Sequence, residues 1–299
     1  MMQHTPLLFE GCATALVTPF CNGELDKNAF LRILRYQIHN GADALVVAGT
    51  TGESPTLTDR EKEWLFTTAV REAAAAPRKI PVIAGTGSNN TRRAVELSRM
   101  AKACGADGLL VVTPYYNKAS EAGILGHYEA ITAAAALPVV VYHVPSRTGC
   151  RLTPLLCKRL SEMDGIAGLK DATGDMAFAA RTAALCGDSL PIYAGNDDLI
   201  LPILSLGGRG VISVVSNLYP AAVSRLCRLW RDGKCAEATS LQLAMIPLCD
   251  ALFCEVNPIP VKAGMESLGL CSSEVRLPLT PAEELVRARV AEAMGNGGM

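Results

Sequence analysis

The chain has 299 residues, of which 49% are hydrophobic, and its formal net charge is −1. A near-neutral chain without a basic run gives no electrostatic reason to expect a nucleic acid or an anionic membrane as partner. No stretch approaches the roughly 20 apolar residues of a membrane-spanning helix, and the N-terminal residues do not resemble a signal peptide, so we expect a cytoplasmic protein.

The chain contains eleven cysteines, an odd number, and none of them forms a C-x-x-C pair. Most lie in predicted strands or helices among apolar neighbours. We interpret them as small buried hydrophobic residues in a reducing compartment, rather than as disulfides or metal ligands.

Eight short apolar runs, rich in Val, Ile and Leu, recur at intervals of roughly 25 to 35 residues. They barely alternate between apolar and polar residues, which is typical of strands buried on both faces of a parallel sheet. In chain order the predicted strands are Ala13–Val17, Ala44–Ala48, Pro81–Ala84, Gly108–Val112, Pro138–Tyr142, Ile166–Leu169, Pro191–Ala194 and Gly210–Val214.

The segments between these runs carry helix signals. Asp26 can cap a helix that Asn40-Gly41 closes, and Thr58-Asp59-Arg60-Glu61 has the pattern of a capping box. Thr153-Pro154 opens another helix with proline at its first position. After about residue 225 the strand signals stop, and the chain is predicted to form helices at Leu226–Trp230, Glu237–Phe253, Pro260–Leu268 and Pro281–Met294.

Eight strand–helix units within residues 1–224 predict a (β/α)8 TIM barrel. Residues 225–299 are predicted to form a helical region that packs on the barrel. A doubly wound open sheet is the structural alternative. The barrel is favoured because the units are nearly even and no glycine-rich phosphate-binding fingerprint follows the first strand.

In a parallel barrel, functional side chains lie where strands end and loops begin. Lys170 stands at the end of the strand Ile166–Leu169. Burial of an ammonium group is costly and favours the neutral amine, which is the form that adds to a carbonyl. Lys170 is therefore a candidate Schiff-base nucleophile. The alternatives are a salt bridge with Asp171 or a solvated loop lysine.

Tyr142 and Tyr116 lie at the ends of neighbouring predicted strands. A phenol can relay protons if a chain of hydroxyl groups connects it to water, and Thr50 could bridge the two. Either tyrosine alone is more simply interpreted as an amphipathic residue at the edge of the core.

Residues at two further strand ends could bind carboxylate groups of a substrate. Gly49-Thr50-Thr51-Gly52-Glu53 offers backbone N–H groups and hydroxyl groups near a helix start. Arg147 lies in a loop whose backbone Pro145 restricts and which ends at Gly149. It can hold a second carboxylate with two hydrogen bonds. These residues predict a lysine imine with a small keto acid, and a second acidic substrate.

The strand ends lack the ligand set of a metal site. His143 is the single histidine among them, and we interpret it as a packed residue rather than a ligand or base. Asp197-Asp198 is interpreted as a helix N-cap rather than a pair of catalytic acids.

Several motifs together resemble the dihydrodipicolinate synthase family, which belongs to the pyruvate-dependent Schiff-base class I aldolases that include N-acetylneuraminate lyase. The resemblance spans nearly the whole chain. It rests on Gly49-Thr50-Thr51-Gly52-Glu53, Tyr115-Tyr116-Asn117, Tyr142-His143-Val144-Pro145-Ser146-Arg147-Thr148-Gly149, Gly168-Leu169-Lys170-Asp171-Ala172-Thr173-Gly174 and Asn257-Pro258-Ile259-Pro260-Val261-Lys262.

The resemblance implies that pyruvate forms an imine with the lysine, and that the derived enamine attacks aspartate semialdehyde in the diaminopimelate and lysine biosynthesis pathway. It implies no cofactor and no metal. The implied catalytic residues are Lys170, Tyr142, Thr50 and Tyr116, and the implied substrate-binding residues are Thr51, Gly52 and the backbone at Ile212 for pyruvate and Arg147 for the semialdehyde.

The resemblance also implies a homotetramer of two tight dimers, in which Tyr116 reaches the partner's site. Family members that lysine inhibits have histidines at the positions of Asp59 and Lys62 and a glutamate at that of Arg93. An arginine in place of an acid repels a ligand ammonium, so we expect weak or absent inhibition by lysine.

Three alternatives stay open. A related aldolase, such as N-acetylneuraminate lyase or a 2-keto-3-deoxy sugar acid aldolase, would share the lysine and Tyr142 but lack Arg147 in a Ser-Arg-Thr-Gly setting. A non-catalytic metabolite sensor on the same barrel would lack the lysine, the tyrosine or the arginine. A metal-dependent hydrolase would need metal ligands at the strand ends.

Overall fold

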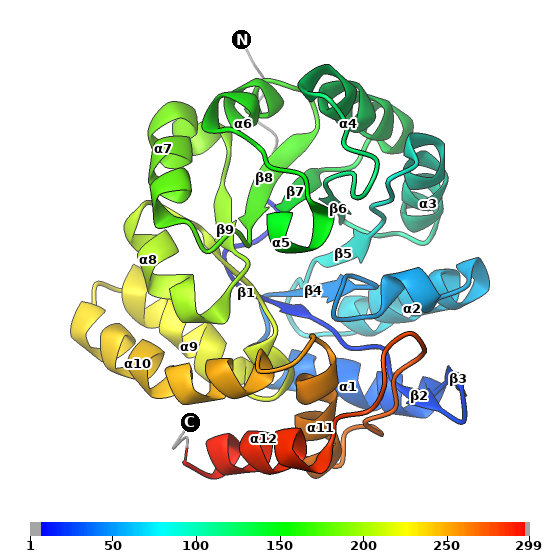
Figure 1. Ribbon diagram of the computed structural model, residues 1–299, viewed down its shortest axis with the longest axis vertical. Helices are drawn as coiled ribbons and strands as arrows, with labels where there is room; N and C mark the ends of the chain where they lie inside the picture. Colours follow the sequence, from blue (N-terminus) through cyan, green and yellow to red (C-terminus); the bar gives the residue numbers. More distant parts are fainter. Residues whose placement is uncertain (1–6, 297–299) are drawn as a thin grey trace.

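Eight parallel strands close into a barrel in this computed structural model, which describes residues 7–296. Their order around the barrel is β1-β10-β9-β8-β7-β6-β5-β4, and helices surround them (Figure 1). The strands are β1 Gly11–Ala15, β4 Ala44–Val47, β5 Val82–Gly85, β6 Gly108–Val112, β7 Val139–His143, β8 Ile166–Asp171, β9 Ile192–Ala194 and β10 Gly210–Ser213. The predicted TIM barrel is confirmed. The open sheet is wrong, because β1 pairs with both β4 and β10.

The strands are buried on both faces. One set of side chains fills the barrel interior, where Phe9 stacks on Tyr193 with ring centroids 4.3 Å apart. The other set packs against the surrounding helices. Both environments are apolar, which is why the strands have continuous apolar sequences rather than alternating ones.

The helices between the strands begin and end at the predicted signals. Asp26 accepts a hydrogen bond from the backbone N–H of Ala29, Thr58 and Glu61 form the capping box, and Pro154 is a first helical residue. These helices are α1 Lys27–His39, α2 Asp59–Ala74, α3 Thr91–Ala103, α4 Glu121–Ala135, α6 Pro154–Ser161, α7 Met176–Cys186 and α8 Ile200–Ser205.

Four further helices follow the last strand: α9 Pro220–Arg231, α10 Cys235–Leu252, α11 Ile259–Ser267 and α12 Glu284–Asn296. All four were predicted, but α9 begins six residues before the predicted Leu226, with Pro220 at its first position. The predicted division between residues 224 and 225 falls inside α9, and it stays a prediction. Figure 1 shows α11 and α12 beside α1, on one side of the barrel.

Several short elements were not predicted. Strands β2 Phe20–Cys21 and β3 Glu24–Leu25 form a hairpin whose turn, Asn22-Gly23, has positive φ at both residues. The expected loop around Arg147 is the short helix α5 Pro145–Thr148. The 3-10 helices are η1 Ser54–Thr56, η2 Gly187–Ser189, η3 Asp197–Leu199 and η4 Val215–Asn217. Each of these is too short to produce a periodic pattern.

Seven of the eleven cysteines are buried, in agreement with their interpretation as small core residues. Within residues 7–296, no helix is both long enough and apolar enough to cross a membrane.

Candidate active site

Lys170 lies near the carboxyl end of β8, beside Tyr142 on β7 and Tyr193 on β9. It is only 5% exposed, and its Nζ atom lies 4.4 Å from the centre of the Tyr142 ring. Burial lowers the pKa of Lys170 from 10.5 to about 8, against an opposing effect of the Asp197 carboxylate. Lys170 forms no ion pair with another described residue; Asp171, the next residue along the strand, points to the opposite face.

Tyr142 ends the apolar part of β7 and is buried. Burial raises the pKa of its phenol, and the Thr50 hydroxyl and the Arg147 cation oppose that rise. The phenol is therefore protonated at neutral pH and has a hydroxyl neighbour. The predicted grouping of Lys170, Tyr142 and Thr50 is thus present in the single chain.

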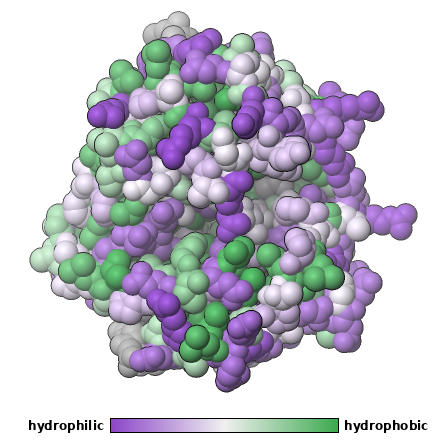
Figure 2. Space-filling view, in the orientation of Figure 1, coloured by the Kyte–Doolittle hydropathy of each residue, from purple (hydrophilic) through white to green (hydrophobic). Residues whose placement is uncertain are grey.

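Two adjoining cavities open at this end of the barrel. Figure 2 shows a hollow near the centre of this face. One cavity, of about 370 Å³, is lined by Lys170, Tyr142, Thr51, Arg147 and Asn257 among others. The second, of about 460 Å³, shares Tyr142 and Arg147 with the first and extends past Thr50 and Tyr115 to Lys62 and Arg93. Arg147 therefore lies between the buried lysine and the outer cavity.

Asn257 connects two predicted substrate-binding residues, and its role was not predicted. Its Nδ2 atom donates to the hydroxyl oxygen of Thr51 at 2.9 Å. Its backbone carbonyl accepts from the Nη2 atom of Arg147 at 3.2 Å. The only sequence signal was its place in the Asn257–Lys262 motif, immediately before α11.

The turn after β4 offers free backbone donors. The N–H groups of Thr51 and Gly52 make no hydrogen bond to any residue between 7 and 296. The turn leaves little room for a side chain at residue 52, since a Cβ atom there would lie 3.1 Å from the backbone of both Ala48 and Leu16. Free N–H groups in a tight turn suit a carboxylate.

Three other predicted residues are not among those that line the two cavities. Gly52 and Ile212 do not line either cavity, and the Ile212 side chain packs inside the barrel. Tyr116, in the loop after β6, is 89% exposed with a positive φ. A single chain therefore does not bring Tyr116 to Thr50 and Tyr142.

The interpretation of Asp197 as a helix N-cap is wrong, because Asn196 occupies that position in η3. Asp197 is buried and accepts hydrogen bonds from the Ser213 hydroxyl and from the backbone N–H groups of Val214 and Val215. It links the end of β9 to the end of β10. Burial raises its pKa, and these hydrogen bonds oppose that rise.

His143 is a packed residue, as predicted. Its Nε2 atom accepts from the Leu152 N–H at 3.0 Å, and its ring packs edge-on against Phe178. Burial lowers its pKa to about 4, so the ring is neutral. Within the described range 7–296, no three His, Cys, Asp or Glu side chains gather as metal ligands.

The sequence profile of the Dihydrodipicolinate synthetase family matches residues 8–296. The chain belongs to this family. A 4-hydroxy-tetrahydrodipicolinate synthase of Citrifermentans bemidjiense is 45% identical over 287 residues, which cover 96% of this chain and 98% of the relative. The family resemblance inferred from the motifs is therefore confirmed.

Solved structures of dihydrodipicolinate synthases superpose closely on this family member. The enzyme of Cyanidioschyzon merolae, solved with lysine bound, has a TM-score of 0.94 at 39% identity and covers 98% of this chain and 99% of its own. The chloride-inhibited enzyme of Acinetobacter baumannii, solved with pyruvate, has a TM-score of 0.93 at 38% identity, with 97% and 99% covered.

Proposed function

We infer that this member of the dihydrodipicolinate synthetase family is a 4-hydroxy-tetrahydrodipicolinate synthase, which condenses pyruvate with L-aspartate 4-semialdehyde. The observation that carries the proposal is the buried Lys170, whose amine faces a cavity and whose pKa is lowered to about 8. A related enzyme was solved with pyruvate, and curated relatives are named as this synthase.

The reaction begins at the amine of Lys170. The neutral Nζ atom adds to C2 of pyruvate, and loss of water gives the protonated imine. Loss of a proton from C3 then gives the enamine, whose C3 atom attacks the aldehyde carbon of the semialdehyde. The amino group of the semialdehyde attacks C2, closes the ring and displaces Lys170, which returns as a free amine.

Tyr142 exchanges the protons that these steps require. Its ring lies against the Lys170 Nζ atom, and its protonated phenol supplies a proton as the carbinol oxygen leaves as water. Thr50 connects Tyr142 toward the outer cavity, which both residues line. This arrangement carries protons between the buried imine and solvent.

Two anion-binding groups hold the two carboxylates. Thr51, with the free N–H groups of the turn and the backbone at Ile212, binds the carboxylate of pyruvate close to Lys170. Arg147, which makes no ion pair with another described residue, binds the carboxylate of the semialdehyde. No cofactor is required, because the protonated imine is itself the electron sink.

The related aldolases, N-acetylneuraminate lyase and the 2-keto-3-deoxy sugar acid aldolases, are less well supported. Both would use the same lysine, but their sugar substrates do not call for a second carboxylate-binding arginine beside the cavity. We expect the enzyme to act in the cytoplasm as a homotetramer, in which Tyr116 completes the proton relay of a neighbouring subunit.

The test is a coupled assay with pyruvate, aspartate semialdehyde, the reductase that consumes the product, and NADPH. We expect NADPH oxidation with the wild type and none with Lys170→Ala. The matched control is Lys158→Ala, which removes a partly exposed lysine of α6 that lines neither cavity. No oxidation by the folded wild type would refute the proposal, and a borohydride-trapped pyruvate adduct in that sample would indicate a related aldolase.

A further inference from the structure

The turn that carries Thr51 and Gly52 is held by residues more than 200 positions away in the chain. Asn257 donates to the Thr51 hydroxyl, with a sequence separation of 206. Lys262 donates to the Oε1 atom of Glu53 at 2.5 Å, with a separation of 209. Both donors belong to α11 or to the residues just before it, so one helix holds the turn on either side of Gly52.

The pair of Glu53 and Lys262 is fully buried, with side chains 1% and 0% exposed. Each charge has further partners: the Lys262 Nζ atom donates to the Glu274 carbonyl at 2.6 Å and lies 4.3 Å from the centre of the Phe20 ring. The Oε2 atom of Glu53 accepts from the backbone N–H of Arg276 at 2.9 Å. Both carboxylate oxygens are therefore fixed, which determines where the backbone of residue 53 lies.

The backbone of this turn needs such support. Glu53 has φ +53°, a conformation that favours glycine over residues with a side chain. The carbonyl of Gly52 accepts from the Thr18 hydroxyl at 2.7 Å, and Glu53 N–H donates to the Thr50 carbonyl at 3.0 Å. These hydrogen bonds fix the turn in a conformation in which the N–H groups of Thr51 and Gly52 donate to no residue between 7 and 296.

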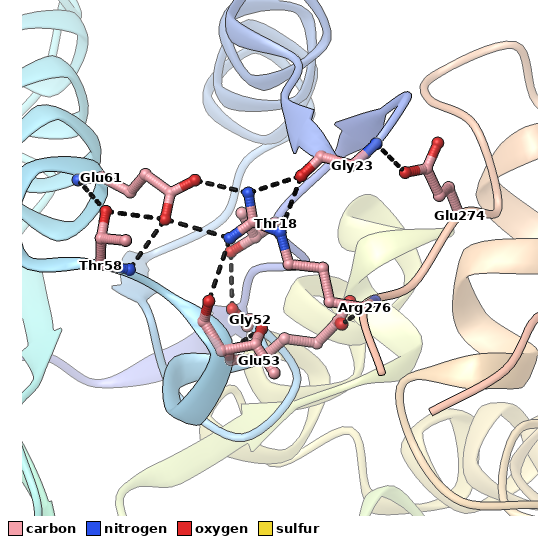
Figure 3. Close-up of polar contacts among 9 residues, drawn as sticks. Thr18, Gly23, Gly52, Glu53, Thr58, Glu61, Glu274 and Arg276 are labelled. Carbon is pink, nitrogen blue, oxygen red and sulfur yellow. Dashed lines mark hydrogen bonds and ion pairs between the residues drawn. The ribbon is translucent and has the colours of Figure 1, made fainter. Parts of the chain in front are cut away.

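Arg276, whose backbone N–H binds Glu53, also contacts helix α2 through its side chain. Figure 3 shows its guanidinium between the carbonyl of Gly23 and the carboxylate of Glu61, above Gly52 and Glu53. Its side chain also donates to the Thr56 carbonyl at 3.0 Å. Glu61 does not contact the turn itself, so the pair of Arg276 and Glu61 offers a neighbouring ion pair for comparison.

We propose that Glu53 and Lys262 are positioning residues for catalysis, which shape the Thr51-Gly52 turn into the binding site for the carboxylate of the keto acid. The proposal rests on the proposed function for the location of that carboxylate. The two charges lie behind the turn and do not touch substrate. They act by keeping the Thr51 hydroxyl and the free N–H groups in one arrangement.

The test measures pyruvate affinity separately from condensation. Borohydride traps the Lys170 imine, and the trapping rate at increasing pyruvate concentration gives a half-saturating concentration without the semialdehyde. We expect Glu53→Gln to raise this concentration at least about tenfold, while kcat at saturating pyruvate falls by less than about threefold. The KM for aspartate semialdehyde should stay unchanged.

Two further variants make the outcome decisive. Glu53→Gln leaves the ammonium of Lys262 buried without a carboxylate, which can prevent folding. In that case the trapping measurement uses Glu53→Gln/Lys262→Met, which removes both charges. Glu61→Gln is the matched control: it removes the carboxylate partner of Arg276 and should lower the melting temperature, but leave the half-saturating pyruvate concentration within about twofold of wild type.

An unchanged half-saturating concentration in a folded Glu53 variant would overturn the proposal, as would an equal rise in Glu61→Gln. These results can be distinguished from the result expected if the protein is not the proposed synthase. In that case the wild type would form the trapped pyruvate adduct but consume no semialdehyde, and the comparison of variants by trapping would still test the turn.

Discussion

At Lys170 a cost in stability and a gain in reactivity have the same cause. Burial of the ammonium disfavours its charge, which lowers the pKa to about 8. At pH 7.4 about a fifth of such a lysine is neutral, against about 0.1% of an unperturbed one. The Asp197 carboxylate opposes this shift and stabilises positive charge at this end of the barrel, where we propose that the protonated imine forms.

This pKa predicts the pH dependence of imine formation. Only the neutral amine reacts, so the initial rate at low pyruvate should rise about tenfold per pH unit below pH 8 and level off above it. Rapid quenching with borohydride followed by mass spectrometry of the intact protein measures the adduct. Circular dichroism at each pH checks that the protein stays folded. A rate that already levels off below pH 7 would contradict the assignment.

Tyr142 offers a test of the proton relay at a single atom. Tyr142→Phe removes the phenol oxygen and keeps the buried ring against Lys170, so the fold should be retained. Because general acid–base catalysis contributes about 10² to 10⁴ in rate, we expect kcat in the coupled assay to fall by about that factor. A fall of less than about threefold would exclude Tyr142 as the proton donor.

Among the short elements, α5 sets the direction of Arg147. Pro145 begins this four-residue helix and Gly149, at φ +66°, ends it. The Arg147 guanidinium then reaches the carbonyl of Asn257, which lies immediately before α11. The helix therefore presents the arginine at the boundary of the two cavities.

This placement predicts which substrate depends on Arg147. Arg147→Lys keeps the positive charge but cannot form two parallel hydrogen bonds to a carboxylate. We expect the KM for aspartate semialdehyde to rise at least about tenfold, the effect of one lost charge-assisted hydrogen bond. Trapping of the pyruvate imine should be unchanged. A weaker pyruvate imine with an unaltered semialdehyde KM would reverse the assignment of the two carboxylates.

Helices α2 and α3 line the outer cavity with cations. Lys62 is buried and has no ion-pair partner among the described residues, and burial lowers its pKa. Arg93 forms an ion pair with Asp59, so the nearby carboxylate is already occupied. A ligand ammonium would meet repulsion here.

We therefore predict weak or absent inhibition of the enzyme by lysine. Initial rates at saturating substrates should change by less than about a tenth in millimolar lysine, because the repulsion opposes binding. Arginine and ornithine at the same concentration serve as controls for nonspecific effects of a cationic amino acid. A saturable fall in rate that lysine alone produces would contradict the prediction.

The sequence was sufficient to predict long elements and residues at strand ends. The proximity of Lys170 and Tyr142 was predictable because parallel strands bring their carboxyl ends to one edge. The hairpin β2–β3 was missed because its strands have two residues each. The roles of Asp197, Asn257 and Lys262 were missed because their partners lie 16, 206 and 209 residues away, and local patterns carry no signal for such pairs.

At the scale of the whole molecule, α11 and the residues after it connect the C-terminal region to the first part of the barrel. Lys262, the Glu274 carboxylate and Arg276 all contact residues among the first 61 of the chain. A residue in the C-terminal region thus influences a turn after β4. Removal of the chain from about residue 255 would therefore leave Glu53 buried without its partner, and such a fragment should lose pyruvate binding as well as stability.

Tyr116 extends from the molecule instead of toward its own site. Its side chain is 89% exposed, and an exposed tyrosine at a loop tip is suited to burial against another subunit. If two chains each contribute Tyr116 to the other, then Tyr116→Phe and Lys170→Ala are both poorly active alone. In a mixed dimer, the Tyr116→Phe subunit keeps Lys170 and receives an intact Tyr116 from its partner.

This arrangement predicts recovery of activity on mixing. After the two variants are unfolded and refolded together in equal amounts, half of the dimers are mixed and one of their two sites is complete. The activity should reach about a quarter of wild type by random assortment. Light scattering of the same sample establishes that it is oligomeric. If Tyr116 serves its own subunit, every site lacks one residue, and the mixture stays as inactive as its components.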